Sequence, residues 1–455
     1  MDHVLSFLRD VLKEPALLLG IVSCIGLISL KAKWHKVLVG TLGPILGYIM
    51  LGIGASAIVS SLEPLGQLIE HGFKITGVIP NNEAVVATAQ KLLGIETMSI
   101  LVVGLIINVL IARFTKYKYV FLTGHHSFFM ACLLSAVLGA LGFKNYALIV
   151  LGGFFLGAWS AISPAIGQKY TLKVTDYDDI AMGHFGSIGY YLSAWIGSKV
   201  GNPEDSAEKI KIPEQFGFLR NTTISTAITM LFFYLLCGLV AGFDFVQTLS
   251  DGQSALVFLV MTSFKFAVGV TVVYSGVRMI LSDLIPAFQG IARKVIPNAI
   301  PAVDCAVFFT YAQTSVIIGF IFSFIGGIVG MLILGFSGAI LIIPGLVPHF
   351  FCGATAGIYG NATGGKKGAI IGSFFNGLLI TFLPALLLPV LGKLGFANTT
   401  FGDADFGILG IILGKIGTYG EIGIYIICLI VLLVLIIPNF IQTKTNVINN
   451  EEEGK

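Results

Sequence analysis

Residues 152–165 read GGFFLGAWSAISPA, and residues 372–385 read GSFFNGLLITFLPA. Both stretches keep a Gly-x-Phe-Phe-x-Gly pattern followed at the same spacing by Pro-Ala. Glycine is common in this chain, with 56 in 455 residues, but prolines number only 15 and three of them fall in register. We therefore interpret the chain as a duplication. Offsets of 220 to 222 residues also relate Pro64 to Pro286, Ile79-Pro80 to Ile300-Pro301, and His184-Phe185-Gly186 to Asp405-Phe406-Gly407.

The composition places the chain in a lipid bilayer. Hydrophobic residues make up 56% of the sequence and charged residues 11%, and the mean hydropathy is +0.92. A water-soluble fold could not bury so much apolar surface, whereas a membrane protein exposes it to lipid. The net charge of +3 comes from short basic runs between apolar blocks, which argues against nucleic acid as a partner. No removable signal peptide is expected, because acids interrupt the basic region that one would need.

Eleven apolar stretches are long enough to cross a bilayer. Basic residues follow the first, third, seventh and ninth of them, which puts the N-terminus outside and the C-terminus in the cytoplasm. The second span matches the seventh in the repeat, and because five is an odd step, matched segments cross in opposite directions. The sequence thus predicts an all-α polytopic membrane protein with two inverted repeats of five spans plus one. The spans begin near Pro15, Leu38, Met98, Val120, Tyr146, Thr222, Ser254, Ser315, Ala339, Ala369 and Glu421.

The predicted domain boundaries follow from these spans. The first repeat covers residues 14–200 and ends in a re-entrant segment at His184, and a cytoplasmic loop follows at 201–219. The second repeat covers 220–416 with a re-entrant segment at Asp405. The last span (417–443) and a cytoplasmic tail (444–455) complete the chain.

Each repeat also contains a segment that is too short and too polar to cross. Leu62, Leu65, Ile69 and Phe73 recur at helical spacing in the first copy, and residues 284–291 form its counterpart. We expect amphipathic helices lying in the membrane interface, with ordinary connecting helices as the alternative.

Both amphipathic segments end in a proline-containing turn that carries an acid. The turns are Pro80-Asn81-Asn82-Glu83 and Pro301-Ala302-Val303-Asp304. Proline lacks a donor and disfavours helix before it, so the helices are predicted to break there. A carboxylate at bilayer depth costs about 2.5 to 3.5 kcal/mol and usually faces a cavity. Glu83 and Asp304 are therefore candidates for a solute site, and the alternative makes them solvated helix caps in the headgroup region.

Three histidines lie in short polar stretches inside the apolar sequence. His125 and His126 follow Gly124, and His184 lies in a Gly-rich stretch that is too short to span. Imidazole offers a donor and an acceptor on one rigid ring, which suits the hydroxyls of a sugar-like solute. Phe128, Phe129 and Phe185 would supply apolar faces. A structural role is the alternative for each histidine, above all for His126.

The sequence predicts no metal, no cofactor and no catalysis by this chain alone. It shows no metal-ligand spacing, no Ser-His-Asp order and no phosphate-binding Gly-Lys loop. The six cysteines lie singly in apolar segments and are predicted to be small core residues.

Several motifs are spread along the sequence from end to end. They are Pro-Ala-Leu-Leu-Leu-Gly-Ile-Val-x-Cys (Pro15 to Cys24), Leu122-Thr123-Gly124-His125, Gly183-His184, Ser225-Thr226-Ala227-Ile228, Gly276-Val277-Arg278-Met279, Val303-Asp304-Cys305-Ala306 and Ile342-Ile343-Pro344-Gly345. Together they resemble those of the membrane-embedded IIC components of bacterial phosphotransferase systems (PTS), in the ascorbate branch of the ascorbate/galactitol superfamily.

This resemblance implies a homodimer in the bacterial inner membrane, with a dimerising scaffold and a core that carries the solute across. The solute is phosphorylated as it arrives inside, by a cysteine of a separate IIB protein that IIA, enzyme I, HPr and phosphoenolpyruvate supply. This sequence contains neither soluble domain, so IIA and IIB are expected partners. The resemblance places the solute contacts on Asn82, Glu83, His125, His126, Ser127, Phe128, Phe129, His184, Phe185 and Asp304.

The sequence also departs from the ascorbate pattern. Phe129 and Phe185 replace glutamines, and Glu83 replaces a tyrosine. A site built to bond a polar solute discriminates against analogues with unmatched groups, so these changes should alter what fits. An ionised Glu83 would also repel an anion such as ascorbate. Another polyol or sugar acid remains a candidate for the solute.

We expect an elevator motion in which Glu83, Asp304, His125 and His184 hold one solute near mid-membrane, with Asp304 as a candidate general base. Phosphorylation would then oppose return of the solute. The rival is a proton-coupled secondary transporter that uses Glu83 or Asp304, and a channel or structural membrane protein is the third class. The polar stretch 201–216 would either help to dock IIB or be a solvated loop.

Overall fold

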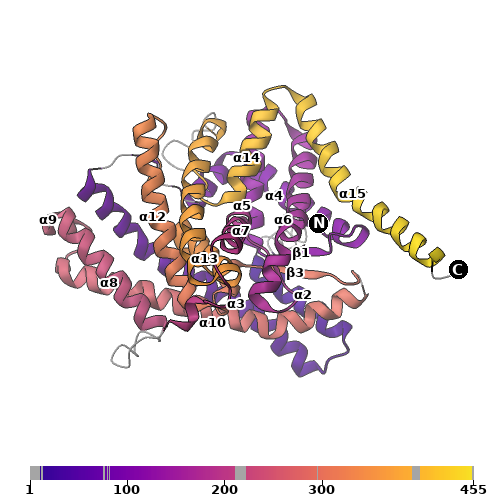
Figure 1. Cartoon of the computed structure of the whole chain (residues 1–455), viewed down its shortest axis with the longest axis horizontal. Coiled ribbons are helices and arrows are strands. Elements are labelled where there is room, and N and C mark those ends of the chain that lie inside the picture. Colours follow the sequence, from indigo (N-terminus) through magenta and orange to yellow (C-terminus); the bar gives the residue numbers. More distant parts are fainter. Residues whose placement is uncertain are drawn as a thin grey trace.

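We describe the fold from a computed structural model, which defines residue 11 and residues 14–74, 77–78, 80, 82–210, 222–294, 296–391 and 400–452. This part of the chain is almost entirely helical (Figure 1). Its helices are α2 (Pro15–Ser29), α3 (Trp34–Phe73), α4 (Asn82–Phe114), α5 (Gly124–Ala140), α6 (Asn145–Thr175), α7 (Ser187–Val200), α8 (Thr222–Ala241), α9 (Phe243–Leu249), α10 (Ala255–Lys294), α11 (Cys305–Phe308), α12 (Gln313–Ser337), α13 (Leu346–Leu391), α14 (Ala404–Gly417) and α15 (Glu421–Glu452). Strands β1 (Tyr119–Phe121), β2 (Ala181–Met182) and β3 (Ile300–Val303) and the short helix η1 (Ala207–Lys209) complete it.

Six helices of the described chain are long and apolar enough to cross a membrane, or seven if the bent pair α8 and α9 forms one span. This agrees with a polytopic α-helical membrane protein. The count is lower than eleven because some predicted spans are short helices and because α13 contains two of them. α2 has 15 residues and α5 has 17, whereas a perpendicular span needs about 20.

The segments predicted as separate amphipathic helices continue the helices before them. α3 and α10 each run for 40 residues, which is about 60 Å at 1.5 Å per residue. Both segments are thus helical, as predicted, and each forms the end of a longer helix. Leu65 and Leu68 of α3 are buried in the main core, so this end of the helix packs on protein.

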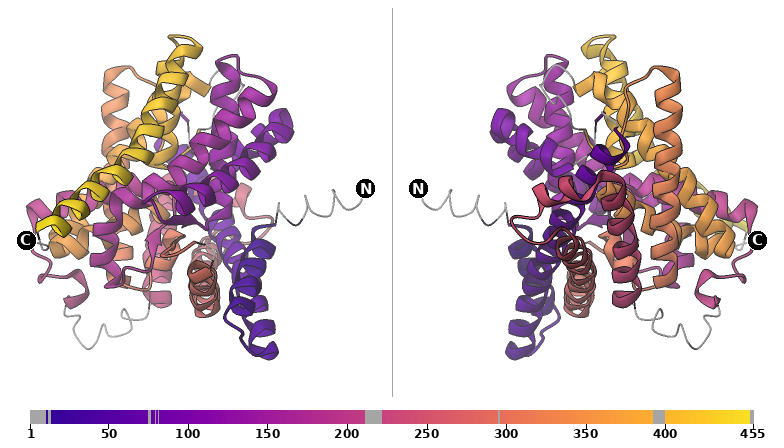
Figure 2. Two further views of the ribbon diagram at one scale, coloured as in Figure 1. Left: turned by 90° about the vertical axis from the view of Figure 1, so that its right-hand side faces the viewer. Right: turned by 90° about the vertical axis from the view of Figure 1, so that its left-hand side faces the viewer.

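α3 and α10 lie against each other. A Cβ atom on Gly269 would lie only 2.9 Å from the carbonyl oxygen of Gly54, so a small residue is needed at this crossing. α8 and α9 lie at one edge of the molecule in Figure 1, and α15 lies at the opposite edge. Figure 2 shows α2 and the first part of α3 (indigo) projecting from the body, and α15 (yellow) running obliquely along its outside.

A small parallel sheet joins segments that are distant in sequence. β3 lies between β1 and β2, with Val120 opposite Pro301 and Met182 opposite Val303. A further parallel bridge pairs Val78 with Ile342. The sheet and this bridge each connect the first half of the chain to the second through main-chain hydrogen bonds.

α13 contains the ninth and tenth predicted spans as two halves of one kinked helix. Gly364 and Gly365 have non-helical backbone angles, and Gly365 has φ +58° and ψ −152°. Only glycine adopts this combination without strain. The backbone of the 201–210 segment lies against this kink, since a Cβ on Gly365 would lie 2.4 Å from the carbonyl oxygen of Asn202.

The described part of the predicted polar loop, residues 201–210, is fixed on two helices. The carboxylate of Glu208 accepts the N–H groups of Thr314 and Ser315 at 2.9 and 2.8 Å, which caps the start of α12. Lys366 of α13 pairs with Asp205 at 3.0 Å. This portion is therefore docked on protein, while residues 211–216 lie outside the described residues.

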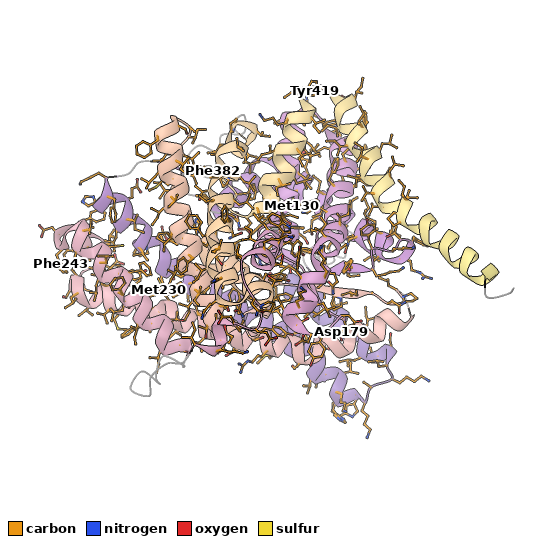
Figure 3. All side chains as sticks on the ribbon, in the orientation of Figure 1. Met130, Asp179, Met230, Phe243, Phe382 and Tyr419 are labelled. Atoms are coloured by element: carbon orange, nitrogen blue, oxygen red, sulfur yellow. The ribbon has the colours of Figure 1, made fainter. Side chains whose placement is uncertain are left out.

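Buried side chains fill the interior of the molecule. Figure 3 labels Met130, which has no exposed area and lies in the middle, whereas Phe243 and Tyr419 lie at the edges. α15 exposes an apolar face that includes Ile422, Ile426 and Leu429. Such faces suit contact with lipid.

Candidate functional site

The three strands of the small sheet each lead into a segment that carries candidate residues. β1 precedes His125 and His126, β2 precedes His184, and β3 precedes Asp304. Because the strands are parallel, their carboxyl ends lie at one edge of the sheet. The sheet therefore brings candidate residues from three separate segments of the chain to the same edge.

The outer part of the site is an imidazole and carboxylate pair. His125 Nε2 lies 3.3 Å from Asp304 Oδ2, and the two side chains are 31% and 16% exposed. Asp304 also accepts the N–H of Ala306 at 3.1 Å and thereby caps α11. Tyr48 of α3 contacts His125 Nδ1 through its hydroxyl at 3.4 Å. Asp304 is thus a helix cap, as the alternative interpretation held, but one that is largely buried and paired.

The inner part of the site consists of His126 and His184. Both are buried, and their ring centroids are 3.7 Å apart. The N–H of Phe185 donates to His126 Nδ1 at 3.3 Å, and the N–H of Gly186 donates to His184 Nδ1 at 3.1 Å. The turn that carries His184 therefore holds both rings.

A buried carboxylate that the sequence interpretation missed completes this inner part. Asp403 Oδ2 accepts the amide of Asn82 at 3.2 Å, and Asp403 Oδ1 accepts the Cys352 thiol at 3.3 Å. Asn82 also accepts the N–H of Gly402 at 2.9 Å. The signal was available, because Asp403 lies two residues before Asp405 in the segment that the repeat aligns with His184.

Asp405 itself is an anchor behind the site. Its side chain has no exposed area and accepts hydrogen bonds from Trp159 Nε1 at 3.1 Å, Ser187 Oγ at 2.8 Å and Ile188 N at 3.0 Å. Its own N–H donates to the carbonyl of Phe185 at 2.9 Å. α7 has no capping side chain at its own N-terminus, so Asp405 caps it from the other half of the chain.

The candidate aromatic residues take two different positions. Phe129 is partly buried, and its ring meets those of His125 and His126 with centroids 5.8 Å apart. Phe185 is fully buried and stacks on Phe121 at 4.5 Å. Its ring therefore belongs to the core, while its backbone N–H donates to His126.

Ser127, Phe128 and Glu83 are the remaining candidate residues. Ser127 is buried and its hydroxyl donates to the carbonyl of Thr123. Phe128 packs against the buried core that contains Met130 and Phe185. The side chain of Glu83 lies outside the described residues, although α4 begins one residue before it, at Asn82.

Two sets of side chains in the described chain approach the spacing of metal ligands. One ligating atom from each of His126, His184 and Asp403 lies within 4.8 Å of the others, and His184, Asp304 and Cys305 form a second such set. The arrangement therefore concentrates nitrogen and oxygen groups that can bond a polar solute or an ion.

Comparison with known proteins matches the chain to transport components. The family model described as "PTS system sugar-specific permease component" (EIIC-GAT) matches residues 10–405. The chain is 27% identical, over 419 residues, to the Mycoplasma pneumoniae protein named "Ascorbate-specific PTS system EIIC component". This match covers 80% of the chain and 63% of the relative, so the chain spans a little less than two thirds of the length of that curated relative.

Proposed function

The chain belongs to the EIIC-GAT family of PTS sugar-specific permease components, and from this premise we propose that it is the sugar-translocating IIC permease of an ascorbate-type phosphotransferase system. Its solute is a sugar acid or a polyol-like relative of ascorbate. Separate IIA and IIB proteins supply the phosphoryl group. The name of the Mycoplasma relative supports the ascorbate branch.

One observation carries the assignment of the solute site. His125, His126, His184 and Asp304 come from three distant parts of the sequence and meet at one edge of the small sheet. Imidazole and carboxylate groups provide both donors and acceptors, which suits a solute with several oxygen atoms. Asn82, Asp403 and Phe129 extend this site.

The proposed architecture is two inverted repeats, residues 14–200 and 220–416, followed by a last span. Equal lengths of α3 and α10 support it, as does the reciprocal pairing of β1 with β3 and of Val78 with Ile342. In this proposal the core carrying the site moves against a dimerising scaffold that contains α3 and α10. A homodimer in the inner membrane, with the N-terminus outside, belongs to the same proposal.

Phosphorylation makes the transport directional. The phosphoryl group passes from a cysteine of IIB to a solute hydroxyl, so the S–P bond breaks, an O–P bond forms and the hydroxyl proton must leave. In this proposal Asp304, which faces His125 at 3.3 Å, accepts that proton. The added charge of about −1.5 to −2 disfavours return through the membrane and past the acidic site.

Reconstituted vesicles test this function. Vesicles containing the purified chain are loaded with phosphoenolpyruvate, enzyme I, HPr, IIA and IIB, and labelled ascorbate is added outside. We expect phosphorylated solute to accumulate inside, and omission of IIB to abolish accumulation. Accumulation driven by a pH gradient without these proteins would instead establish proton coupling, and the absence of saturable uptake across a panel of sugar acids and polyols would contradict both.

A further inference from the structure

The connection between α2 and α3 forms the tip of a helical hairpin. The two helices run antiparallel, since Ser23 Oγ donates to the carbonyl oxygen of Gly40 and a Cβ atom on Gly20 would meet the side chain of Ile45. Residues 31–36, which read Lys-Ala-Lys-Trp-His-Lys, cover the turn and the start of α3, and we call this segment the basic tip. Figure 2 shows the hairpin (indigo) projecting from the body of the molecule.

The basic tip carries three lysines that the described part of the chain does not balance. Lys31, Lys33 and Lys36 are all exposed, and none of them forms an ion pair with another described residue. Residues 15–62 contain no aspartate and no glutamate, so the hairpin itself offers no acid as a partner. The positive charge of the basic tip is therefore available to an anion outside the protein.

The helices on both sides of the basic tip expose apolar stripes. Their exposed residues recur every three or four positions, as one face of a helix requires. They are Leu17, Ile21, Ile25 and Ile28 on α2, and Leu38, Leu42, Leu46, Ile49 and Ile53 on α3. These stripes are about 16 and 22 Å long, and the hydrocarbon core of a bilayer is about 30 Å thick. Because both stripes start beside the lysines, contact of the stripes with lipid places the basic tip at one surface of the bilayer.

Trp34 marks the same boundary. Its side chain is 77% exposed, although it is large and mainly apolar. Indole has an apolar body and one N–H donor, and tryptophan is enriched where hydrocarbon meets the headgroups. Lysine likewise lays its alkyl chain along apolar groups and keeps its ammonium group in the polar layer. An exposed tryptophan among lysines therefore suits a lipid surface better than a water-soluble polyanion.

We propose that the basic tip binds the headgroups of anionic phospholipids, such as phosphatidylglycerol, and thereby anchors the α2–α3 hairpin at one membrane surface. The ammonium groups meet the lipid phosphates, and each lysine near an anionic surface strengthens binding about fivefold. This surface is separate from the candidate solute site. Tyr48, the residue of α3 that contacts His125, follows Trp34 by about 21 Å along the helix. The proposal depends neither on the solute nor on its phosphorylation.

Thermal unfolding of the purified full chain tests the lipid preference. The protein is kept in an uncharged detergent, and phosphatidylglycerol, phosphatidylcholine or the water-soluble headgroup glycerophosphoglycerol is added. We expect phosphatidylglycerol to raise the melting temperature at concentrations at which the other two have no effect, because binding to the folded state stabilises it. About 1 M salt should remove this difference, since exposed charges are then screened. Equal stabilisation by phosphatidylcholine, or stabilisation by glycerophosphoglycerol, would overturn the proposal.

A triple variant assigns the effect to the basic tip. Lys31→Gln, Lys33→Gln and Lys36→Gln together remove three exposed charges without removing a printed contact. The phosphatidylglycerol concentration that gives half of the stabilisation should rise about tenfold or more. An unchanged concentration would place the lipid elsewhere on the protein and overturn the proposal.

The control variant makes the same change at three other exposed lysines, Lys199, Lys209 and Lys367. These lysines lie at or beside the docked 201–210 segment, which also carries exposed acids such as Glu204 and Asp205. We expect the half-stabilising concentration of phosphatidylglycerol to stay within about twofold of the wild type. An equal rise in both triple variants would mean that net charge alone matters, and this too would overturn the proposal.

Tryptophan fluorescence locates the basic tip without any change to its lysines. The chain is placed in bilayers, and the emission of Trp34 is obtained as the difference between the wild type and Trp34→Phe. Spin labels on the lipids quench nearby indoles. We expect strong quenching by a headgroup label, weak quenching by a label at the end of the acyl chain, and more quenching by labelled phosphatidylglycerol than by labelled phosphatidylcholine. Absence of quenching, or equal quenching by the two lipids, would overturn the proposal even if the lysine variants fold poorly.

Discussion

The segments that contain His184 and Asp405 align in the two halves of the sequence, yet they serve different ends. His184-Phe185-Gly186 directs its imidazole toward His126, whereas Asp405-Phe406-Gly407 directs its carboxylate back to the start of α7. The two phenylalanines are both buried, with ring centroids 5.9 Å apart. The local backbone differs, since His184–Gly186 precede α7 whereas Asp405–Gly407 lie in the first turn of α14. One polar residue faces the candidate site and the other supports it.

Removing the anchor should have the largest effect. Asp405→Ala leaves the Trp159, Ser187 and Ile188 donors unpaired in the interior, at about 1 to 3 kcal/mol each. We expect a large fall in melting temperature in detergent and little folded protein. Asp205→Ala removes an exposed acid in an ion pair with Lys366 and is the control, with an expected cost of about 0 to 1 kcal/mol. Similar melting temperatures for the two variants would refute the anchoring role.

Changing the partly exposed acid should affect solute and not folding. Asp304→Asn keeps a side chain that can cap α11, because Asn is as good a cap as Asp. It removes the charge that faces His125 at 3.3 Å. We expect a melting temperature close to that of the wild type and uptake reduced about tenfold or more, the value of a charged hydrogen bond. A stability loss as large as that of Asp405→Ala would erase the distinction between the two acids.

Removing one donor from the anchor should have an intermediate effect. Trp159→Phe keeps an aromatic ring but deletes the indole N–H that donates to Asp405 at 3.1 Å. The expected destabilisation is about 1 kcal/mol, measured by thermal or denaturant unfolding. Ser187→Ala removes a second donor of the same carboxylate. Because the donors share one acceptor, the double variant should depart from additivity.

The smallest effect is expected at the rim of the site. Tyr48→Phe removes a hydroxyl whose contact with His125 is 3.4 Å long, near the limit for a hydrogen bond. We expect solute affinity to fall about two- to fivefold, the value of a weak neutral bond, without a change in melting temperature. Equilibrium binding measured beside Asp304→Asn gives the comparison. A loss larger than that of Asp304→Asn would make Tyr48, and not Asp304, the main partner of His125.

Much of the fold could be predicted from the sequence because apolar length and proline placement act locally. Helices do end before both prolines, since α4 begins only at Asn82 and Pro301 follows the end of α10 at Lys294. The turn predicted at 301–304 is, however, strand β3 (Ile300–Val303), after which Asp304 caps α11. The continuity of α3 could not be predicted from polarity alone. Its polar end stays helical because Leu65 and Leu68 are buried against other helices.

The site was predictable only in part. His125, His184 and Asp304 were identified from their short polar settings, and the structure brings them together. Asp403 was missed because its partners, Asn82 and Cys352, lie 321 and 51 residues away in sequence. Phe185 was assigned to the solute from its place in a motif, but its ring is buried among aromatic residues. Such contacts depend on tertiary packing, which a local pattern does not contain.

The order of strands in the small sheet has a consequence for how the protein is made. β3 lies between β1 and β2, so neither of the earlier strands has a partner until the ribosome has added Val303, 121 residues after Met182. At roughly 5 to 20 residues per second, this interval lasts about 6 to 24 s. During this time the backbone N–H and C=O groups of β1 and β2 lack their strand partner, and the lipid beside them cannot form hydrogen bonds with them. Assembly during synthesis therefore has a defined late step, in which β3 from the second half of the chain pairs with both strands of the first half.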